Sequence, residues 1–194
     1  MKKKKTLKRE LIEWGAILSI FAVLFFTGLH TVVIGNVQRI VLATGIMQPS
    51  LKTESEEPAS YKMLLRDASG NITDFDSFKG KVIFMNFWAT WCPPCIAEMP
   101  DIQSLYDEVN NDNIAFVMIS VDEQPEKAFT FADKKSYTFP VYSLHSELPS
   151  VYHSRSIPTT FVISPNGQIV SRREGMAKYN TKKFKKFLAD LNEP

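Results

Sequence analysis

The sequence predicts an α/β protein: a mixed β-sheet flanked by helices, preceded by an N-terminal transmembrane helix. Beyond residue 61, apolar runs typical of strands alternate with helix-like segments, an order that favours a helix-covered sheet. Two late strand-like runs flank Pro165-Asn166-Gly167, a turn signal that indicates antiparallel neighbours. Near the N-terminus, a long uncharged apolar stretch follows a cluster of Lys and Arg, which indicates a membrane-spanning helix.

The first 60 residues form three segments that differ in composition. Residues 1–13 are basic, with six Lys or Arg among the first nine positions. Residues 14–38 carry no formal charge and predict a transmembrane anchor, because a helix needs about 20 apolar residues to cross the hydrocarbon. We expect residues 39–60 to be a juxtamembrane segment and a polar linker, because the later part is polar, aperiodic and contains Pro.

The basic segment should remain in the cytoplasm, which predicts a single-pass protein of the cell membrane with its main domain on the extracytoplasmic (periplasmic) side. A cleaved signal peptide is the alternative interpretation. Its apolar region usually covers about 7–15 residues and ends before a small-x-small site. The present apolar run is longer, and no clear site of that kind follows Leu29. An uncleaved anchor is therefore favoured.

Residues 61–194 are enough for one domain with one hydrophobic core. The run 114–121 is apolar at consecutive positions, which is typical of a strand buried on both faces. Other strands are expected at 63–65, 72–75, 82–88, 141–142, 159–164 and 168–172, and helices at 94–109, 126–135 and 181–192. The domain holds 15 Lys or Arg against 16 Asp or Glu, so its charge does not favour binding to nucleic acid.

The only two cysteines, Cys92 and Cys95, lie where the predicted strand 82–88 gives way to a helix. Unpaired backbone N–H groups and the positive end of the helix dipole stabilise a thiolate there. Pro93 disfavours helical geometry at the residue before it, so we expect Cys92 at the N-cap, with an exposed sulfur, and Cys95 in the first turn. This arrangement predicts a redox pair in which Cys92 attacks a disulfide and Cys95 resolves the product.

Three other roles for the cysteine pair are disfavoured. A structural disulfide across so short a loop removes little entropy from the unfolded chain. A zinc site needs four ligands, and the only histidines, His30, His145 and His153, lack the usual spacing. Unreactive core cysteines fit poorly with the flanking prolines. The sequence therefore predicts neither a metal site nor an organic cofactor.

The segment from Phe87 to Pro100, Phe-Trp-Ala-Thr-Trp-Cys-Pro-Pro-Cys-Ile-Ala-Glu-Met-Pro, resembles the active-site segment of the thioredoxin superfamily. It is most similar to the membrane-tethered TlpA/ResA-like thiol-disulfide oxidoreductases that are associated with cytochrome c maturation. The later run Ile157-Pro158-Thr159-Thr160 resembles the cis-proline loop of that family. The resemblance extends over residues 61–191.

The resemblance implies roles for residues outside the cysteine pair. Pro158 matches the cis-proline that faces the active-site disulfide, and Ile157 matches the residue whose backbone pairs with a bound substrate segment. Trp91 and Pro93 are expected at the same substrate-binding surface. Pro100 matches a proline inside the redox helix, where it should remove one backbone hydrogen bond and bend the helix.

Glu98 matches an acidic residue that the ResA-like branch carries three positions after the second cysteine. At this spacing it shares a helix face with Cys95, so the resemblance implies a catalytic role in which it tunes the thiols or accepts a proton. An exposed helix carboxylate is the alternative. Asn86 lies where cytoplasmic thioredoxins keep a buried Asp, and an amide cannot take up a proton, which leaves Glu98 or water as the base.

The sequence therefore predicts an extracytoplasmic, membrane-anchored thiol-disulfide oxidoreductase, expected to be monomeric. The resemblance implies that it reduces disulfides of client proteins, apocytochrome c among them, and requires a transmembrane electron donor of the DsbD/CcdA kind. A thiol peroxidase of the same fold is one alternative, but it needs Thr or Ser where the sequence has Ala89. A non-catalytic copper-handling module is another, although copper carriers on this scaffold use Cys-x-x-x-Cys with a distant His.

Overall fold

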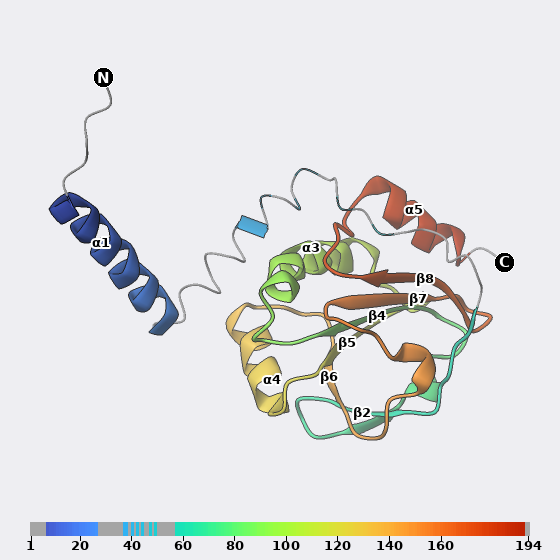
Figure 1. Cartoon of the computed structure of the whole chain (residues 1–194). Coiled ribbons are helices and arrows are strands. Elements are labelled where there is room, and N and C mark those ends of the chain that lie inside the picture. The colour runs from blue at the N-terminus through green and yellow to red at the C-terminus, as the bar shows by residue number, and fades with distance from the viewer. Residues whose placement is uncertain are drawn as a thin grey trace.

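The structure is a computed structural model that describes residues 7–26, residues 37, 38, 40, 42, 44, 47 and 49, and residues 57–192. An eight-stranded sheet forms its centre, in the order β1-β8-β7-β4-β5-β6-β2-β3 (Figure 1). The strands are β1 (Glu57–Pro58), β2 (Leu64–Arg66), β3 (Ile72–Asp74), β4 (Val82–Trp88), β5 (Ile114–Ser120), β6 (Val141–Leu144), β7 (Thr159–Ile163) and β8 (Gln168–Glu174).

The three middle strands carry the core of the domain. Strand β4 pairs in parallel with β5 and antiparallel with β7, and every residue of these three strands is buried. Such strands are apolar at nearly every position because both faces of the sheet are covered. The sheet is mixed, as the sequence predicted, because β7 and β8 form a closing antiparallel pair.

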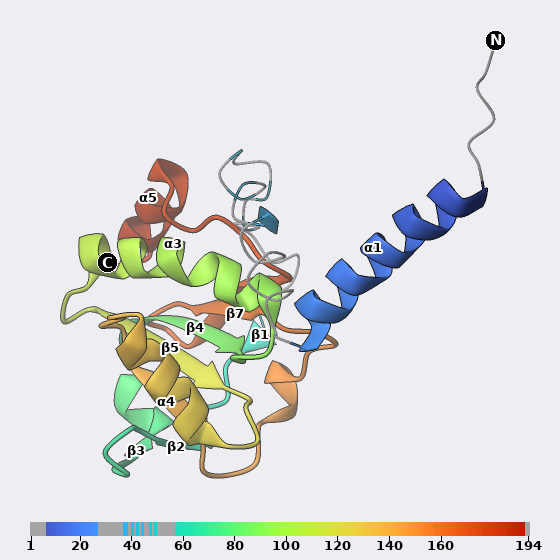
Figure 2. The same ribbon diagram turned by 90° about the vertical axis from the view of Figure 1, so that its left-hand side faces the viewer.

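Three helices of the domain pack on one face of the sheet and enclose the larger hydrophobic cluster. They are α3 (Pro93–Val109), α4 (Pro125–Lys134) and α5 (Lys182–Asp190). Figure 2 shows α3 and α5 side by side above the sheet. Alternate side chains of the central strands, such as Phe84 and Trp88, point toward this helical layer.

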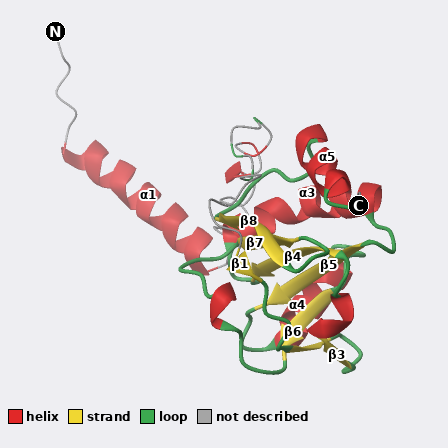
Figure 3. Cartoon of the chain, turned by 90° about the vertical axis from the view of Figure 1, so that its right-hand side faces the viewer, coloured by secondary structure: helices red, strands yellow, loops and turns green. Residues whose placement is uncertain are grey.

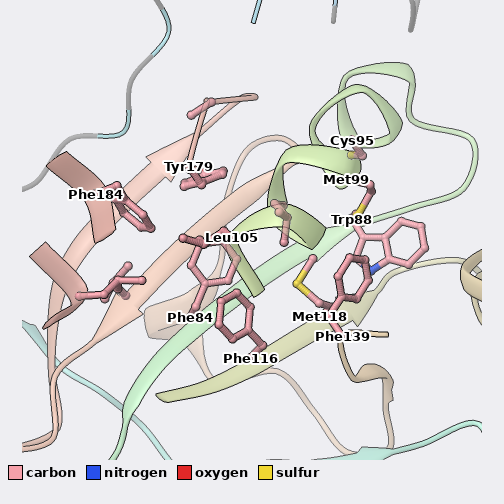
Figure 4. Close-up of a cluster of buried hydrophobic side chains, with 14 of the residues drawn as sticks. Phe84, Trp88, Cys95, Met99, Leu105, Phe116, Met118, Phe139, Tyr179 and Phe184 are labelled. Atoms are coloured by element: carbon pink, nitrogen blue, oxygen red, sulfur yellow. The ribbon is translucent and has the colours of Figure 1, made fainter. Parts of the chain in front are cut away.

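Aromatic rings fill the space between α3, α5 and the sheet (Figure 4). The Phe84 ring is 5.0 Å from that of Phe116, 5.1 Å from that of Tyr179 and 6.1 Å from that of Phe184, measured between centroids. The rings of Tyr179 and Phe184 meet the Phe84 ring edge to face, which is a favoured arrangement of aromatic rings. This packing holds α3 firmly on β4, the strand that leads into it.

The opposite face of the sheet is covered by loops and short turns. A second cluster there includes Phe75, Tyr152 and Phe161, whose side chains pack on the sheet. Within the described residues, this face is covered by irregular chain and two short 3-10 turns, Phe75–Phe78 and Ser150–Tyr152. Figure 3 shows how much loop surrounds the sheet on this side.

Most predicted elements match the structure to within a few residues at their ends. The clearest omission is β1, a two-residue edge strand that pairs with β8. Strand β6 extends to Leu144, two residues beyond its predicted end. Pro100 lies inside α3, which continues through it to Val109.

Helix α1 (Leu7–Phe26) extends away from the domain (Figure 1). Five of its large apolar side chains are exposed to solvent: Ile12, Trp14, Ile17, Leu18 and Val23. In the parts of the chain that are described, no helix has the length and apolarity to cross a membrane. The expected anchor, residues 14–38, is described only at 14–26, 37 and 38.

Met47, in the segment 39–60, is hydrogen-bonded to the domain. The backbone N–H of Lys178 donates a hydrogen bond of 2.8 Å to the carbonyl of Met47. Leu42 is buried. Both positions precede residues 48–60, the polar part that is expected to be a solvated linker.

Candidate active site

The two cysteines form a disulfide at the N-terminus of α3. Cys92 is the N-cap residue, with the extended backbone angles φ −97° and ψ 102°. The backbone N–H of Cys95 points to the Sγ of Cys92 at 3.3 Å. Pro93 occupies the first helical position, where a missing N–H removes no helix bond. The predicted N-cap position of Cys92 is therefore confirmed.

Cys92 is more covered than the exposed sulfur that the sequence predicted at this position. Cys92 is 4% exposed and Cys95 is fully buried. The cover comes partly from the loop before β7, because the carbonyl oxygen of Ile157 lies 3.8 Å from the Sγ of Cys92. The adjacent Trp91 is 62% exposed, so Cys92 lies at the edge of the molecule and Cys95 behind it.

The loop before β7 has the geometry that the resemblance implied. The Ile157–Pro158 peptide bond is cis, and Pro158 is buried directly before β7. Antiparallel pairing of β7 with β4 brings this loop to the disulfide, because Thr159 lies opposite Phe87. Residues that are 65 positions apart in the chain thus meet at one sulfur atom.

A groove of about 410 Å³ is lined by Trp91, which precedes Cys92, and by Ile157, whose carbonyl oxygen contacts the Cys92 sulfur; neither cysteine lines it. Its walls are mostly apolar and come from the β4 end, the loop after β5 and the chain before β7. They are formed by Phe87, Trp91, Val121, Leu148, Tyr152 and residues 153–157. Of the four predicted substrate-binding residues, Trp91 and Ile157 line this groove, whereas Pro93 and Pro158 do not.

Glu98 is completely buried, so the alternative of an exposed helix carboxylate is wrong. Its Oε1 accepts a hydrogen bond of 2.9 Å from the Asn86 side-chain amide, and its Oε2 accepts one of 3.1 Å from the Ala177 backbone N–H. Burial raises the pKa of Glu98 to about 8, and these two hydrogen bonds limit the rise. The carboxyl group therefore titrates near the pH range in which thiols exchange.

Three buried polar residues around the site were not predicted from the sequence. Thr160 and Tyr179 belong to a hydrogen-bond chain that continues from Asn86. Asp122 accepts hydrogen bonds from the backbone N–H and the hydroxyl of Thr90, at 3.0 and 2.6 Å, and thus holds the loop that leads to Trp91. None of the three has a sequence signal of its own, although Thr160 lies in the cis-proline motif.

His145 and His153, the two histidines that the structure describes, do not contact the cysteines. His153 lies in the groove wall, where its Nε2 contacts the Leu148 carbonyl at 3.2 Å. The backbone of His145 pairs with Leu64 at the far side of the sheet, and His30 lies outside the described residues. Across residues 57–192 and the other described positions, no three His, Cys, Asp or Glu side chains are grouped as metal ligands.

Comparison with known proteins identifies relatives of this domain. Residues 57–172 match the AhpC/TSA family. Thiol-disulfide oxidoreductase ResA of Oceanobacillus iheyensis is 36% identical over 109 residues, which cover 56% of this chain and 57% of that protein. ResA of Halalkalibacterium halodurans is 31% identical over 65% of this chain and 71% of its own length. ResA of Bacillus subtilis is 29% identical over 88% of this chain and 86% of its own.

Solved structures show the same fold. StoA from Bacillus subtilis has a TM-score of 0.54 and 27% identity, and the match covers 70% of this chain and all of that one. A thiol:disulfide interchange protein DsbE from Chlorobium tepidum has a TM-score of 0.61 at 20% identity, over 72% of this chain and all of that one. The domain therefore has the thioredoxin-like fold, and the chain belongs to the AhpC/TSA family, within which it is a relative of the ResA thiol-disulfide oxidoreductases.

Proposed function

We propose that this chain is a membrane-anchored enzyme that reduces disulfides of extracytoplasmic client proteins through Cys92 and Cys95. One observation carries the proposal: a disulfide at a helix N-terminus, next to a cis-proline loop and an apolar groove. The helix N-terminus stabilises a thiolate at Cys92 in the reduced enzyme. The groove offers apolar contact to the client residues that flank the attacked sulfur.

The reaction moves two electrons from the enzyme to the client. The Cys92 thiolate attacks one sulfur of the client disulfide, the client S–S bond breaks, and a mixed disulfide and a client thiolate result. Cys95 then loses its proton and attacks the Sγ of Cys92, which releases the second client sulfur as a thiolate. The Cys92–Cys95 disulfide formed in this step is the state that the structure holds.

Glu98 is the proposed proton acceptor for Cys95. It lies one turn further along α3 on the same buried side, where few other groups can take a proton. With a pKa of about 8, the carboxyl group is mostly protonated at pH 7, but a fraction is ionised and able to act as a base. In the reverse direction, the protonated acid can supply a proton to the leaving Cys95 sulfur.

The clients are proposed to be secreted or membrane-attached proteins with accessible disulfides, apocytochrome c among them. Each turnover leaves the enzyme oxidised, so a donor of two electrons must regenerate it. A transmembrane dithiol donor of the DsbD/CcdA kind is the proposed source, because the catalytic domain lies across the membrane from cytoplasmic reductants in this arrangement. We propose that the enzyme acts as a monomer.

Replacing either cysteine should separate the two steps. Cys92→Ser should abolish reduction of insulin disulfides, because no nucleophile remains at the groove. Cys95→Ser should keep the first step and trap a mixed disulfide, visible as a higher-mass band on a non-reducing gel that dithiothreitol removes. The double variant is the control. Insulin reduction that persists in Cys92→Ser would contradict the proposal.

The reductive direction predicts a low reduction potential for the Cys92/Cys95 couple. We expect a value nearer to that of thioredoxin, about −270 mV, than to that of the oxidant DsbA, about −120 mV. Equilibration with glutathione or dithiothreitol buffers, followed by the fluorescence of Trp91 beside the disulfide, measures the potential. A value near that of DsbA would assign this protein to disulfide formation instead.

Glu98→Gln should slow resolution of the mixed disulfide by about 10²-fold, because the step loses its base. In the wild type, the rate of this step should follow the ionisation of Glu98 near pH 8, and the variant should lose that midpoint. Stopped-flow measurement of client-thiol release from pH 6 to 10 tests this, with the exposed Glu147→Gln as the control. Identical pH profiles for wild type and Glu98→Gln would exclude this role.

The same variant tests the burial of the carboxyl group. Because the folded-state pKa of Glu98 is raised, its proton stabilises the folded protein fully at pH values below about 4.5, the unfolded value, and this contribution is lost as pH rises through about 8. Relative to wild type, Glu98→Gln should therefore gain stability in urea unfolding as the pH rises.

The anchoring part of the proposal draws on the basic residues 1–13, the uncharged run 14–38 and the exposed apolar side chains of α1. The full chain should stay with membranes after an alkaline carbonate wash, and protease added outside spheroplasts should remove the domain. A chain that begins at residue 57 and carries no leader should be released to the soluble fraction. Protection of the domain from external protease would reverse the proposed orientation.

A further inference from the structure

A chain of buried polar side chains runs across the core behind the disulfide. Glu98 on α3 contacts Asn86 on β4, Asn86 contacts Thr160 on β7, and Thr160 contacts Tyr179 in the segment before α5. The three contacts measure 2.9, 2.8 and 2.6 Å. All four residues are at most 2% exposed, so these groups satisfy one another rather than water.

The hydrogen-bond pattern of this chain leaves two positions open. The Nδ2 of Asn86 donates to both Glu98 and Thr160, while the Oδ1 of Asn86 is buried without a partner. The Oγ1 of Thr160 accepts from Asn86 and from the Tyr179 hydroxyl. No acceptor for the hydroxyl proton of Thr160 occurs among the hydrogen bonds of the described residues. Buried groups in this condition are uncommon in folded proteins.

The pattern suits only one charge state of Glu98. An ionised carboxylate accepts hydrogen bonds and donates none, so Nδ2 facing it is favourable. A protonated Glu98 has an O–H to donate, and at Oε1 it meets an amide N–H, which is also a donor. Rotation of the Asn86 side-chain amide by half a turn exchanges the positions of Oδ1 and Nδ2. The two groups are of nearly equal size. Oδ1 then accepts from both Glu98 and Thr160, and Tyr179 still donates to Thr160.

We propose that Asn86 is a positioning residue for Glu98. Its side-chain amide rotates by half a turn when Glu98 gains or loses its proton, and the Thr160 hydroxyl changes between accepting from Asn86 and donating to it at the same time. The amide donates to the carboxylate and accepts from the carboxylic acid. Both charge states of Glu98 thus keep a hydrogen-bonded partner at the same place, and a proton can pass to and from Cys95 without disturbing the core. This inference rests on the proposed role of Glu98.

Other titratable groups near Glu98 remain in place in both states. Asp101, on the same helix, accepts hydrogen bonds from the backbone N–H groups of Tyr179 and Asn180 and raises the pKa of Glu98. Arg173 on β8 lowers that pKa. The Tyr179 hydroxyl, whose own pKa burial raises well above its usual range, donates to Thr160 in either state. Only the Asn86 amide and the Thr160 hydroxyl need to change the direction of their hydrogen bonds.

Nuclear magnetic resonance spectroscopy of the oxidised wild-type protein tests the rotation of the Asn86 amide directly. The carboxyl ¹³C signal of Glu98 reports its ionisation between pH 5 and 10. At high pH, the Asn86 side-chain N–H protons should show nuclear Overhauser contacts to Thr160. These contacts should weaken severalfold at low pH, with the same midpoint as the Glu98 titration. Contacts that stay constant while Glu98 titrates, or a Glu98 that keeps one charge state throughout, would overturn the proposal.

Two variants supply a kinetic test. Asn86→Leu removes the amide, and the ionised form of Glu98 loses the stronger, charge-assisted hydrogen bond. The pH midpoint of mixed-disulfide resolution should therefore move up by about one unit, which reduces the rate at pH 7 about tenfold. Tyr179→Phe keeps the aromatic packing and the Asn86–Glu98 contact, so its midpoint should stay unchanged. An unchanged midpoint in a folded Asn86→Leu would contradict the positioning role.

The two tests also separate this inference from the proposed function. The resonance experiment needs no client and no reduction, so it gives a result even if insulin is not a substrate. If Cys92→Ser retained activity but the Asn86 amide rotated as Glu98 titrated, the proposed function would be wrong and the inference about Asn86 right. Glu98→Gln is the matched control, because its neutral side chain should leave the Asn86 contacts independent of pH.

Discussion

Antiparallel pairing of β4 with β7 is the constraint on which the site depends. It sets Phe87 opposite Thr159 and Asn86 opposite Thr160, although these partners lie more than 70 positions apart in the sequence. The first pair brings the cis-proline loop onto the Cys92 sulfur. The second places a hydroxyl against the amide that holds Glu98. A shift of this register by one residue would break both pairs, because the side chains of β7 would move to the opposite face of the sheet.

Helix α3 carries the reactive groups of the site, the disulfide and Glu98. The packing of the helix on the sheet decides the charge state of Glu98. The first turn of α3 holds the disulfide, and its second turn places Glu98 in a fully buried environment. Glu98 takes part in no ion pair of the described residues, and only neutral groups donate hydrogen bonds to it. Because nearby charge does little to favour its ionised form, burial dominates and the proton is held to higher pH. A surface carboxylate at the same helix position would be ionised at pH 7.

The surface of the site is formed by loops from three strand ends. Asp122 holds the loop before Trp91, and the cis-proline loop covers the Cys92 sulfur from the other side. Between them, the apolar groove lies open beside the one cysteine that retains any exposure. A client segment therefore meets Cys92 first and cannot reach Cys95, which explains in physical terms why the two sulfurs have different roles in the proposed cycle.

The sequence by itself determined the elements whose signals are local. Consecutive apolar residues predicted the buried strands at 82–88 and 114–121, and the proline after Cys92 predicted its N-cap position. Strand β1 was not predicted, because two residues at a sheet edge are too few to show a periodic pattern. Helix spacing placed Glu98 on one face with Cys95, but only the packing of α3 on the sheet decided that this face is buried. Thr160, Tyr179 and Asp122 belong to the site through contacts between distant segments, and such contacts leave no pattern in the order of residues.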